Sequence, residues 1–179
     1  MKNKSKRELA VCGFEAVKAI ARFHPEKIQR LYFDETHRYD FGELCKYLAE
    51  KKAPYNIVKE TSELEKLCGS VHHQGVVAMI SQPKVQPLSK EITVEWLHKK
   101  QSVLVLDRVG NANNLGAIVR SAAFFGIKNV VIPIDESQSS ITTSSYRVAQ
   151  GGMELVNIYS VYSIPNLLKE MKGKMVSFG

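Results

Sequence analysis

The feature that most constrains the fold is a strand, a loop and a helix that follow one another over residues 102–126. Residues 102–107 form a short apolar, β-branched run, which is typical of a buried parallel strand. A polar loop follows, and Asn113 or Asn114 is expected to cap the next helix, because an amide oxygen accepts from free N–H groups of the first turn. Gly126 suits the left-handed residue that ends a helix. The pattern therefore predicts a β-α unit.

The helix predicted at 114–125 has one buried stripe. Its members recur at three- and four-residue steps, namely Leu115, Ile118, Val119 and Ala122. Arg120 lies about 140° around the helix from Leu115, so it points away from the core. Most helical arginines are simply solvated. A functional role for Arg120 is the alternative interpretation.

The same alternation continues to Gly179. Strands are expected at 129–134, 155–159 and 174–178, with a helix at 164–171 and a polar stretch, rich in serine and threonine, at 135–152. Strands that alternate with helices predict a parallel sheet with right-handed crossovers. Ligands of such sheets bind at the carboxyl ends of the strands, where Asn114 and the loop after Ile134 would lie.

The first part of the chain shows a second α/β alternation. Helices are predicted at 13–23, at 41–51 and from residue 61, with strands at 28–33, 55–58 and 75–80. This order predicts a small three-layer domain over residues 1–82. A polar, proline-bearing segment at 83–101 reads as a linker, with a short helix around Trp96. The second domain is then 102–179.

The chain is basic, with a formal net charge of +7. Residues 1–8 form a basic tail whose cations are Lys2, Lys4, Lys6 and Arg7. Such a tail either holds phosphates electrostatically or is only a solvated, disordered end.

The cysteines and the apolar runs indicate the cellular compartment in which the protein is expected. Cys12, Cys45 and Cys68 are odd in number and lack metal-ligand or redox spacing. This favours reduced thiols in a cytoplasmic protein and no metal site. No apolar run approaches the roughly 18 residues that span a bilayer, so no membrane contact is expected.

Two strings carry a family resemblance. Asn-Asn-Leu-Gly-Ala-Ile-Val-Arg-Ser-Ala at 113–122, directly after Val-Leu-Val-Leu-Asp-Arg-Val, closely resembles the first signature motif of the SpoU (TrmH-like) RNA ribose 2′-O-methyltransferases. Residues 11–17, Val-Cys-Gly-Phe-Glu-Ala-Val, and residues 73–78, His-Gln-Gly-Val-Val-Ala, resemble the opening and the closing strand of that family's substrate-binding domain. Without the family, His73 and Gln74 would read as a polar turn.

The resemblance implies a fold and a chemistry. The fold would be a substrate-binding domain followed by a SPOUT methyltransferase domain of the trefoil-knot type. The activity would be methylation of a ribose 2′-hydroxyl in tRNA or rRNA with S-adenosylmethionine, by a homodimer when full length. The family's activating arginine matches Arg120, and its positioning asparagine matches Asn114. Residues 147–154 resemble a family turn, which makes Arg147 a candidate phosphate contact. The polar stretch before it is then either a surface loop or the segment that meets ribose and phosphate.

The family also has two later motifs, which form most of the S-adenosylmethionine pocket. They follow a strand that residues 175–179 resemble, so the cofactor-binding residues are expected beyond Gly179, and the chain is expected to be an incomplete form. Two alternatives remain. One is a catalytically silent RNA-binding protein that retains the substrate domain. The other is a dinucleotide-binding unit, which the lack of a G-x-G-x-x-G string disfavours.

Overall fold

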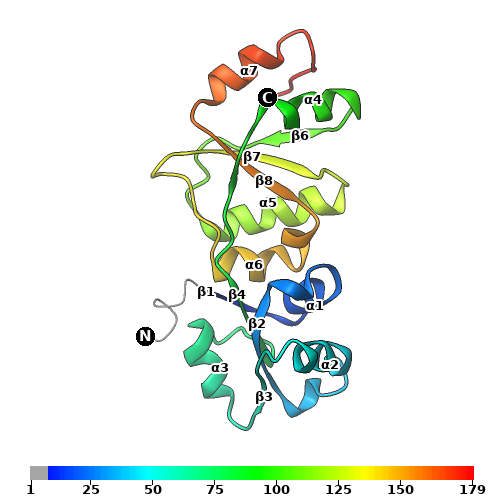
Figure 1. The fold of residues 1–179 in the computed structure, drawn as a ribbon. Helices are drawn as coiled ribbons and strands as arrows, with labels where there is room; N and C mark the ends of the chain where they lie inside the picture. Colours follow the sequence, from blue (N-terminus) through cyan, green and yellow to red (C-terminus); the bar gives the residue numbers. More distant parts are fainter. Residues whose placement is uncertain (1–7) are drawn as a thin grey trace.

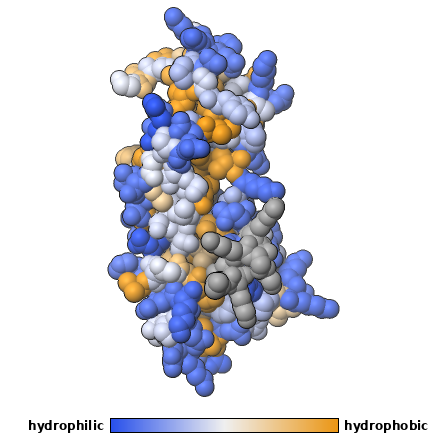
Figure 2. All heavy atoms as spheres, turned by 90° about the vertical axis from the view of Figure 1, so that its left-hand side faces the viewer, coloured by the Kyte–Doolittle hydropathy of each residue, from blue (hydrophilic) through white to orange (hydrophobic). Residues whose placement is uncertain are grey.

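The computed structural model describes residues 8–179 and stacks two four-stranded sheets along the long axis of the molecule (Figure 1). The predicted tail cations Lys2, Lys4, Lys6 and Arg7 lie outside the described residues. On the face drawn in Figure 2, hydrophobic side chains lie along the middle of the molecule between hydrophilic margins.

The first sheet has the strand order β1-β4-β2-β3. Its strands are β1 at Glu8–Cys12, β2 at Ile28–Asp34, β3 at Tyr55–Val58 and β4 at Val76–Ser81. β4 pairs antiparallel with β1 and β2, and β2 pairs parallel with β3. The sequence did not predict β1, because its five residues are too few for a periodicity to be visible beside the charged tail. Its partner β4 lies about 70 positions further along the chain.

Helices cover both faces of the first sheet. They are α1 at Phe14–Phe23, α2 at Gly42–Glu50 and α3 at Thr61–Cys68, with 3-10 turns at Pro25–Lys27 (η1) and Glu35–His37 (η2). Apolar residues of α1 and α2 pack on one face, and Leu64 of α3 packs on the other against Cys12 and Met79. The predicted three-layer α/β arrangement is confirmed.

The second sheet is parallel throughout and has the order β5-β8-β7-β6. Its strands are β5 at Gln86–Pro87, β6 at Val103–Val105, β7 at Asn129–Pro133 and β8 at Asn157–Val161. Its helices are α4 at Lys90–His98, α5 at Ala112–Phe124, α6 at Thr143–Ala149 and α7 at Ile164–Met171, with a 3-10 turn at Gly152–Glu154 (η3). Apolar residues of α5 and α6 bury one face, whereas those of α4 and α7 bury the other.

Residues 83–101 are not the linker that the sequence predicted. β5 within this segment pairs with β8, and Trp96 of α4 packs with Val131 and Leu167 in the core of the second sheet. Proline and polar residues gave the segment the composition of a linker. A two-residue edge strand leaves no periodic signal from which its pairing could be predicted.

The polar stretch at 135–152 contains a helix, α6, that the sequence did not predict. Thr142 and Ser145 form a capping box at its start, and Tyr146 and Ala149 are buried. Serine and threonine are poor helix formers but good caps, so their number concealed the helix.

Residues 174–178 do not form the strand that the sequence predicted. Only an isolated bridge between Lys172 and Met175 is present, and Val176 and Phe178 are 80% and 94% exposed. Among the described residues, no neighbouring strand is present for this segment to pair with, and an unpaired apolar run does not form a strand by itself.

The two sheets share one core. A contiguous cluster of buried side chains runs from the α1 and α2 face of the first sheet to the α5 and α6 face of the second. The Thr143 hydroxyl of α6 donates to the carbonyl of Ala10 in β1 over 2.7 Å, which attaches α6 to both units. Among the described residues, no helix is both long and apolar enough to cross a membrane.

Candidate functional site

The first turn of α5 is capped by Asn111. Its Oδ1 accepts hydrogen bonds from the backbone N–H of Asn113 at 2.8 Å and of Asn114 at 3.3 Å. The prediction that Asn113 or Asn114 is the cap was therefore wrong. Three asparagines compete here, and extended backbone at Asn111 selects the earliest. The side chain of Asn114 is left exposed to solvent.

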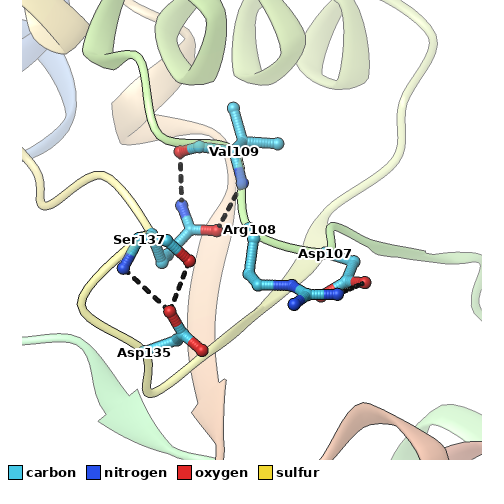
Figure 3. Close-up of polar contacts among 6 residues, drawn as sticks. Asp107, Arg108, Val109, Asp135 and Ser137 are labelled. Carbon is cyan, nitrogen blue, oxygen red and sulfur yellow. Dashed lines mark hydrogen bonds and ion pairs between the residues drawn. The ribbon is translucent and has the colours of Figure 1, made fainter.

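The loops after β6 and β7 are joined at the carboxyl ends of these strands. The Gln138 side chain accepts from the backbone N–H of Val109 at 2.9 Å and donates to its carbonyl at 3.1 Å (Figure 3). Gly110 lies so close that an added Cβ would meet the Ser137 carbonyl oxygen at 2.9 Å. Sequence reasoning missed Gln138, because a lone glutamine in a polar loop carries no signal.

Charged groups at the rim of this edge already have partners. Arg108 donates to both carboxylate oxygens of Asp107, at 3.0 and 3.1 Å. Asp135 accepts from the hydroxyl and the backbone N–H of Ser137 (Figure 3). These hydrogen bonds, with that from the side chain the stronger, hold the pKa of Asp135 below its usual value. The rim is thus an ordered, closed pair of loops.

A cavity of about 940 Å³ opens on the far side of α5, facing α1. One wall is a stripe of α5 with helical spacing: Ala117, Arg120, Ser121 and Phe124. The other wall is a stripe of α1 with the same spacing: Glu15, Lys18, Ala19 and Arg22. The two helices pack on different sheets (Figure 1), so the cavity exists only because the sheets are stacked.

The bottom of the cavity is the turn between α6 and β8. Gly151, with a left-handed φ of +91°, lies under α1, where an added Cβ would approach that of Ala19 to 2.8 Å. Gly152 lies under α5, where an added Cβ would be 3.1 Å from the Cα of Arg120. Two adjacent glycines therefore let one turn contact both walls.

Two family models match this chain, one on each side of the cavity. The model for RNA 2′-O ribose methyltransferase substrate binding covers residues 10–86, which include α1. The model of the SpoU rRNA methylase family covers residues 101–178, which include α5. The chain belongs to the SpoU family.

Relatives of this SpoU chain include named methyltransferases. It is 30% identical over 172 residues to an uncharacterized tRNA/rRNA methyltransferase of Haemophilus influenzae, covering 96% of this chain and 48% of the relative. It is also 30% identical to the 23S rRNA (guanosine-2′-O-)-methyltransferase RlmB of Nitrosomonas europaea, covering 90% of this chain and 62% of the relative. The chain thus spans between about half and two thirds of these proteins.

Solved structures agree on the fold. The chain matches a TrmH-family RNA methyltransferase structure from Porphyromonas gingivalis with a TM-score of 0.66 at 16% identity, over 95% of this chain and 61% of that one. It matches an AdoMet-bound rRNA methyltransferase from Sinorhizobium meliloti with a TM-score of 0.66 at 14% identity, over 96% and 60% of the two chains.

The predicted site residues of the SpoU chain fall in different places. Arg120 is exposed, as its angle to Leu115 predicted, and the structure also places it in the lining of the cavity. Asn114 lies one helical turn before Ala117, beyond the described lining of the cavity, on the side of α5 that carries Ser121. Arg147 of α6 lies near the start of α1 instead, where a Cβ added to Gly13 would be 3.7 Å from its Cγ.

The charges of the cavity are mostly positive. The lining contains three cations, Arg120, Lys18 and Arg22, and a single carboxylate, that of Glu15. A guanidinium cannot act as an ordinary base, because its pKa is above about 12. It can hold a hydroxyl and an adjacent phosphate through several N–H donors, and it stabilises negative charge that develops on oxygen. Within the described residues, no cluster of three or more histidine, cysteine or acidic side chains is placed to hold a metal ion.

Sequence reasoning missed Lys18, Arg22 and the Gly151–Gly152 turn as parts of this site. The polar face of α1 was predictable from its helical period, but the element that this face meets was not. The glycine pair did stand out in the sequence as a small-residue turn.

Proposed function

We propose that the protein containing this chain methylates a ribose 2′-hydroxyl in tRNA or rRNA, with S-adenosylmethionine as the methyl donor. One observation carries the proposal: Arg120 of the SpoU motif faces a large basic cavity, between a helix of the substrate-binding region and a helix of the methylase region. In this reading 1–82 is the RNA-binding unit, and the methyltransferase unit, which the chain contains in part, begins at β5.

Arg120 supplies the chemistry that this chain contributes. Its N–H donors orient the ribose hydroxyl, stabilise the alkoxide that develops on it, and bind the neighbouring phosphate. The walls of the cavity place that ribose, which is the larger part of the task, because in-line transfer depends on holding two reactants in position. Asn114, further along α5, is proposed to position the substrate, and Arg147 to contact a phosphate.

The carboxyl edge of the second sheet offers the methyl donor no open site at β6 and β7. At the carboxyl edge of β6 and β7 the loops are closed on each other through Gln138, and Asp107 and Asp135 already have partners. Ile134, at the same edge, is half exposed. We therefore assign no residue of this chain to S-adenosylmethionine and derive no step through it.

Replacement of Arg120 tests the assignment. In the complete gene product, Arg120→Lys is expected to lower methyl transfer to total RNA by about 10²–10³-fold, because a preorganised donor fork is lost at the developing alkoxide. Transfer is measured as incorporation of labelled methyl groups, and the position by mass spectrometry of nucleosides. Lys169→Ala, an exposed residue of α7, is the control. Near-normal transfer by a folded Arg120→Lys protein would refute the role of Arg120.

A second candidate function is RNA binding without catalysis. The observation that favours it is the basic cavity, which suits RNA, whereas the loops after β6 and β7 are closed on each other. Tight RNA binding by the complete gene product, with no methyl transfer to any cellular RNA, would establish this alternative.

We also propose that the protein is a cytoplasmic homodimer. Val176 and Phe178 are 80% and 94% exposed, which is apolar area that a second copy of the protein would cover. The three cysteines are free thiols, as in reducing compartments. Light scattering of the complete gene product measures its mass in solution, and fractionation of its source cells gives its compartment.

A further inference from the structure

The open cavity between α1 and α5 is called the groove below. We infer that this groove binds a single-stranded segment of the RNA, with its phosphates on Lys18 and Arg22 and its bases on exposed phenylalanines. This inference rests on the proposed function and assigns the substrate contacts around Arg120. The occupant is RNA in its unpaired form, because the groove combines cations with free aromatic faces.

The cations of α1 are placed for a phosphate backbone. Lys18 and Arg22 are both exposed, lie one turn apart on α1, and face Arg120 across the cavity. Their axial separation is about 6 Å, so both can reach one strand that runs along the helix. Each is also held over a ring: Lys18 Nζ lies 5.1 Å from the centre of Phe14, and the Arg22 guanidinium lies 5.4 Å from that of Phe23. Phe23 lines the cavity, so its contact holds Arg22 at the wall, whereas Phe14, which stacks on His37, is not part of the lining.

The aromatic side chains of the groove point to bases. Phe23, Phe124 and Phe125 all line the cavity and are 44%, 83% and 75% exposed. Phe124 and Phe125 meet edge to face with ring centres 5.2 Å apart, so their contact covers at most one face of one ring. Unpaired bases stack on such faces, whereas the bases of a duplex are already stacked on each other. Alternation of cations and aromatic rings is the pattern of single-strand binding.

The volume and the rigidity of the groove agree with this occupant. About 940 Å³ lies at the upper end of ordinary small-molecule sites. The walls of the cavity belong to two units, which the Gly151–Gly152 turn and the shared core hold together. Glu15 is the single anion of the lining and lies one turn before Lys18 on α1. A strand that passes from Lys18 and Arg22 toward Arg120 avoids it.

The salt dependence of RNA affinity tests the phosphate contacts. A labelled single-stranded oligonucleotide is titrated with the complete gene product at several salt concentrations, without S-adenosylmethionine, and anisotropy reports binding. The logarithm of the association constant decreases with the logarithm of the salt concentration. The steepness of this dependence, its slope, should be smaller by about 0.7 in Lys18→Ala and in Arg22→Ala, and by about 1.4 in the double variant. Lys66→Ala on α3 and Lys169→Ala on α7, also exposed helical lysines, should leave the slope unchanged. An unchanged slope in the folded double variant would overturn the inference.

Two substitutions of Phe124 distinguish stacking of RNA bases on its ring from contact with another protein chain. Phe124→Leu retains an apolar side chain but removes the ring, so RNA affinity should fall by about tenfold, while Phe124→Tyr should retain it. If Phe124→Leu binds RNA normally but Phe124→Ala dissociates a dimer, the groove is an interface between copies, and the inference is wrong.

These experiments distinguish failure of the groove assignment from failure of the methyltransferase proposal. If the slope falls but the wild-type protein transfers no methyl group, the groove binds RNA and the methyltransferase proposal fails. If transfer depends on Arg120 but the slope does not change, the methyltransferase proposal stands and the groove assignment fails.

Discussion

Asn111 is the residue that fixes where α5 begins and therefore how its exposed asparagines are presented. Its side chain accepts hydrogen bonds from two backbone N–H groups, so the side chains of Asn113 and Asn114 are not needed to cap the helix. The residue before a motif thus leaves the side chains within the motif available to a ligand. Such a role is invisible in the string of residue types and follows from backbone geometry.

Loss of this cap should be measurable. Asn111→Ala is expected to lower the free energy of unfolding by about 1 kcal/mol, because two donors of the first turn lose their acceptor, whereas Asn111→Asp should retain the stability. Urea denaturation followed by circular dichroism measures both variants. Asn113→Ala is the control, and equal stabilities of Asn111→Ala and Asn113→Ala would show that Asn111 is not the cap.

A pair of thiols gives a second prediction at this scale. The Cys12 thiol is buried and donates to Cys68, which lowers the pKa of Cys68 to about 7 despite its own partial burial. Iodoacetamide should therefore modify Cys68 at near-neutral pH, with a rate that rises through about pH 7. In Cys12→Ala the donor is lost, so the rate profile of Cys68 should shift to higher pH. Peptide mass spectrometry follows each site, with Cys45, whose pKa is raised by burial, as the slow internal reference.

Two helices, α5 and α6, cross in close backbone contact. Gly116 of α5 lies against the backbone of α6, where an added Cβ would be 2.5 Å from the Ser145 carbonyl oxygen. This approach keeps α6 between the two sheets. A helical glycine costs stability by itself, so its presence in mid-helix is explained by packing.

Gly116→Ala should therefore destabilise the protein although alanine is the better helix former. Backbone cannot yield as a flexible side chain can, and overpacking of this kind costs about 1–3 kcal/mol, against about 1 kcal/mol of gained propensity. Gly42→Ala in α2 is the matched control, since nothing lies within 4 Å of its added Cβ. Thermal unfolding compares the two, and a higher midpoint for Gly116→Ala would contradict the close crossing.

The whole molecule is joined by a buried carboxylate as well as by apolar packing. The Glu154 side chain of the second unit is fully buried, and the Lys27 Nζ of the first unit lies 2.6 Å from its Oε2. Burial, and then the Glu154 carboxylate, raise the pKa of Tyr146 beside it. The pair joins η1, which directly follows α1, to the turn between α6 and β8. α1 and this turn are two of the boundaries of the cavity.

Removal of one partner should loosen this junction. Lys27→Met leaves the buried carboxylate with His24 Nε2, 3.9 Å from Oε2, as its remaining basic neighbour. Because Lys27 is itself 40% exposed, we expect a loss of about 1–2 kcal/mol, below that of a fully buried pair. Glu154→Gln in the same background should recover part of it. Denaturation of the four proteins of this double-mutant cycle gives the coupling, and additive effects would show that the two residues do not interact.

Residue patterns by themselves determined the α/β class, the boundaries of most helices and the direction of Arg120. These features depend on periodicity and on residues within one or two turns, which the order of residues contains directly. The predicted strand at Tyr55–Val58 and helix at Ile164–Met171 match the structure at both ends. The motif also identified the family, because its residues are consecutive in the sequence.

Only the tertiary structure decided the rest. Short strands such as β1 and β5 form because a distant partner is present, and the last predicted strand does not form because, among the described residues, none is. α6 is a helix among residues with poor propensity because its buried face packs between the sheets. The cavity itself needs two helices from separate units and two glycines beneath them. Periodicity tells which face of an element is buried, but the partner of that face depends on contacts between residues far apart in the chain.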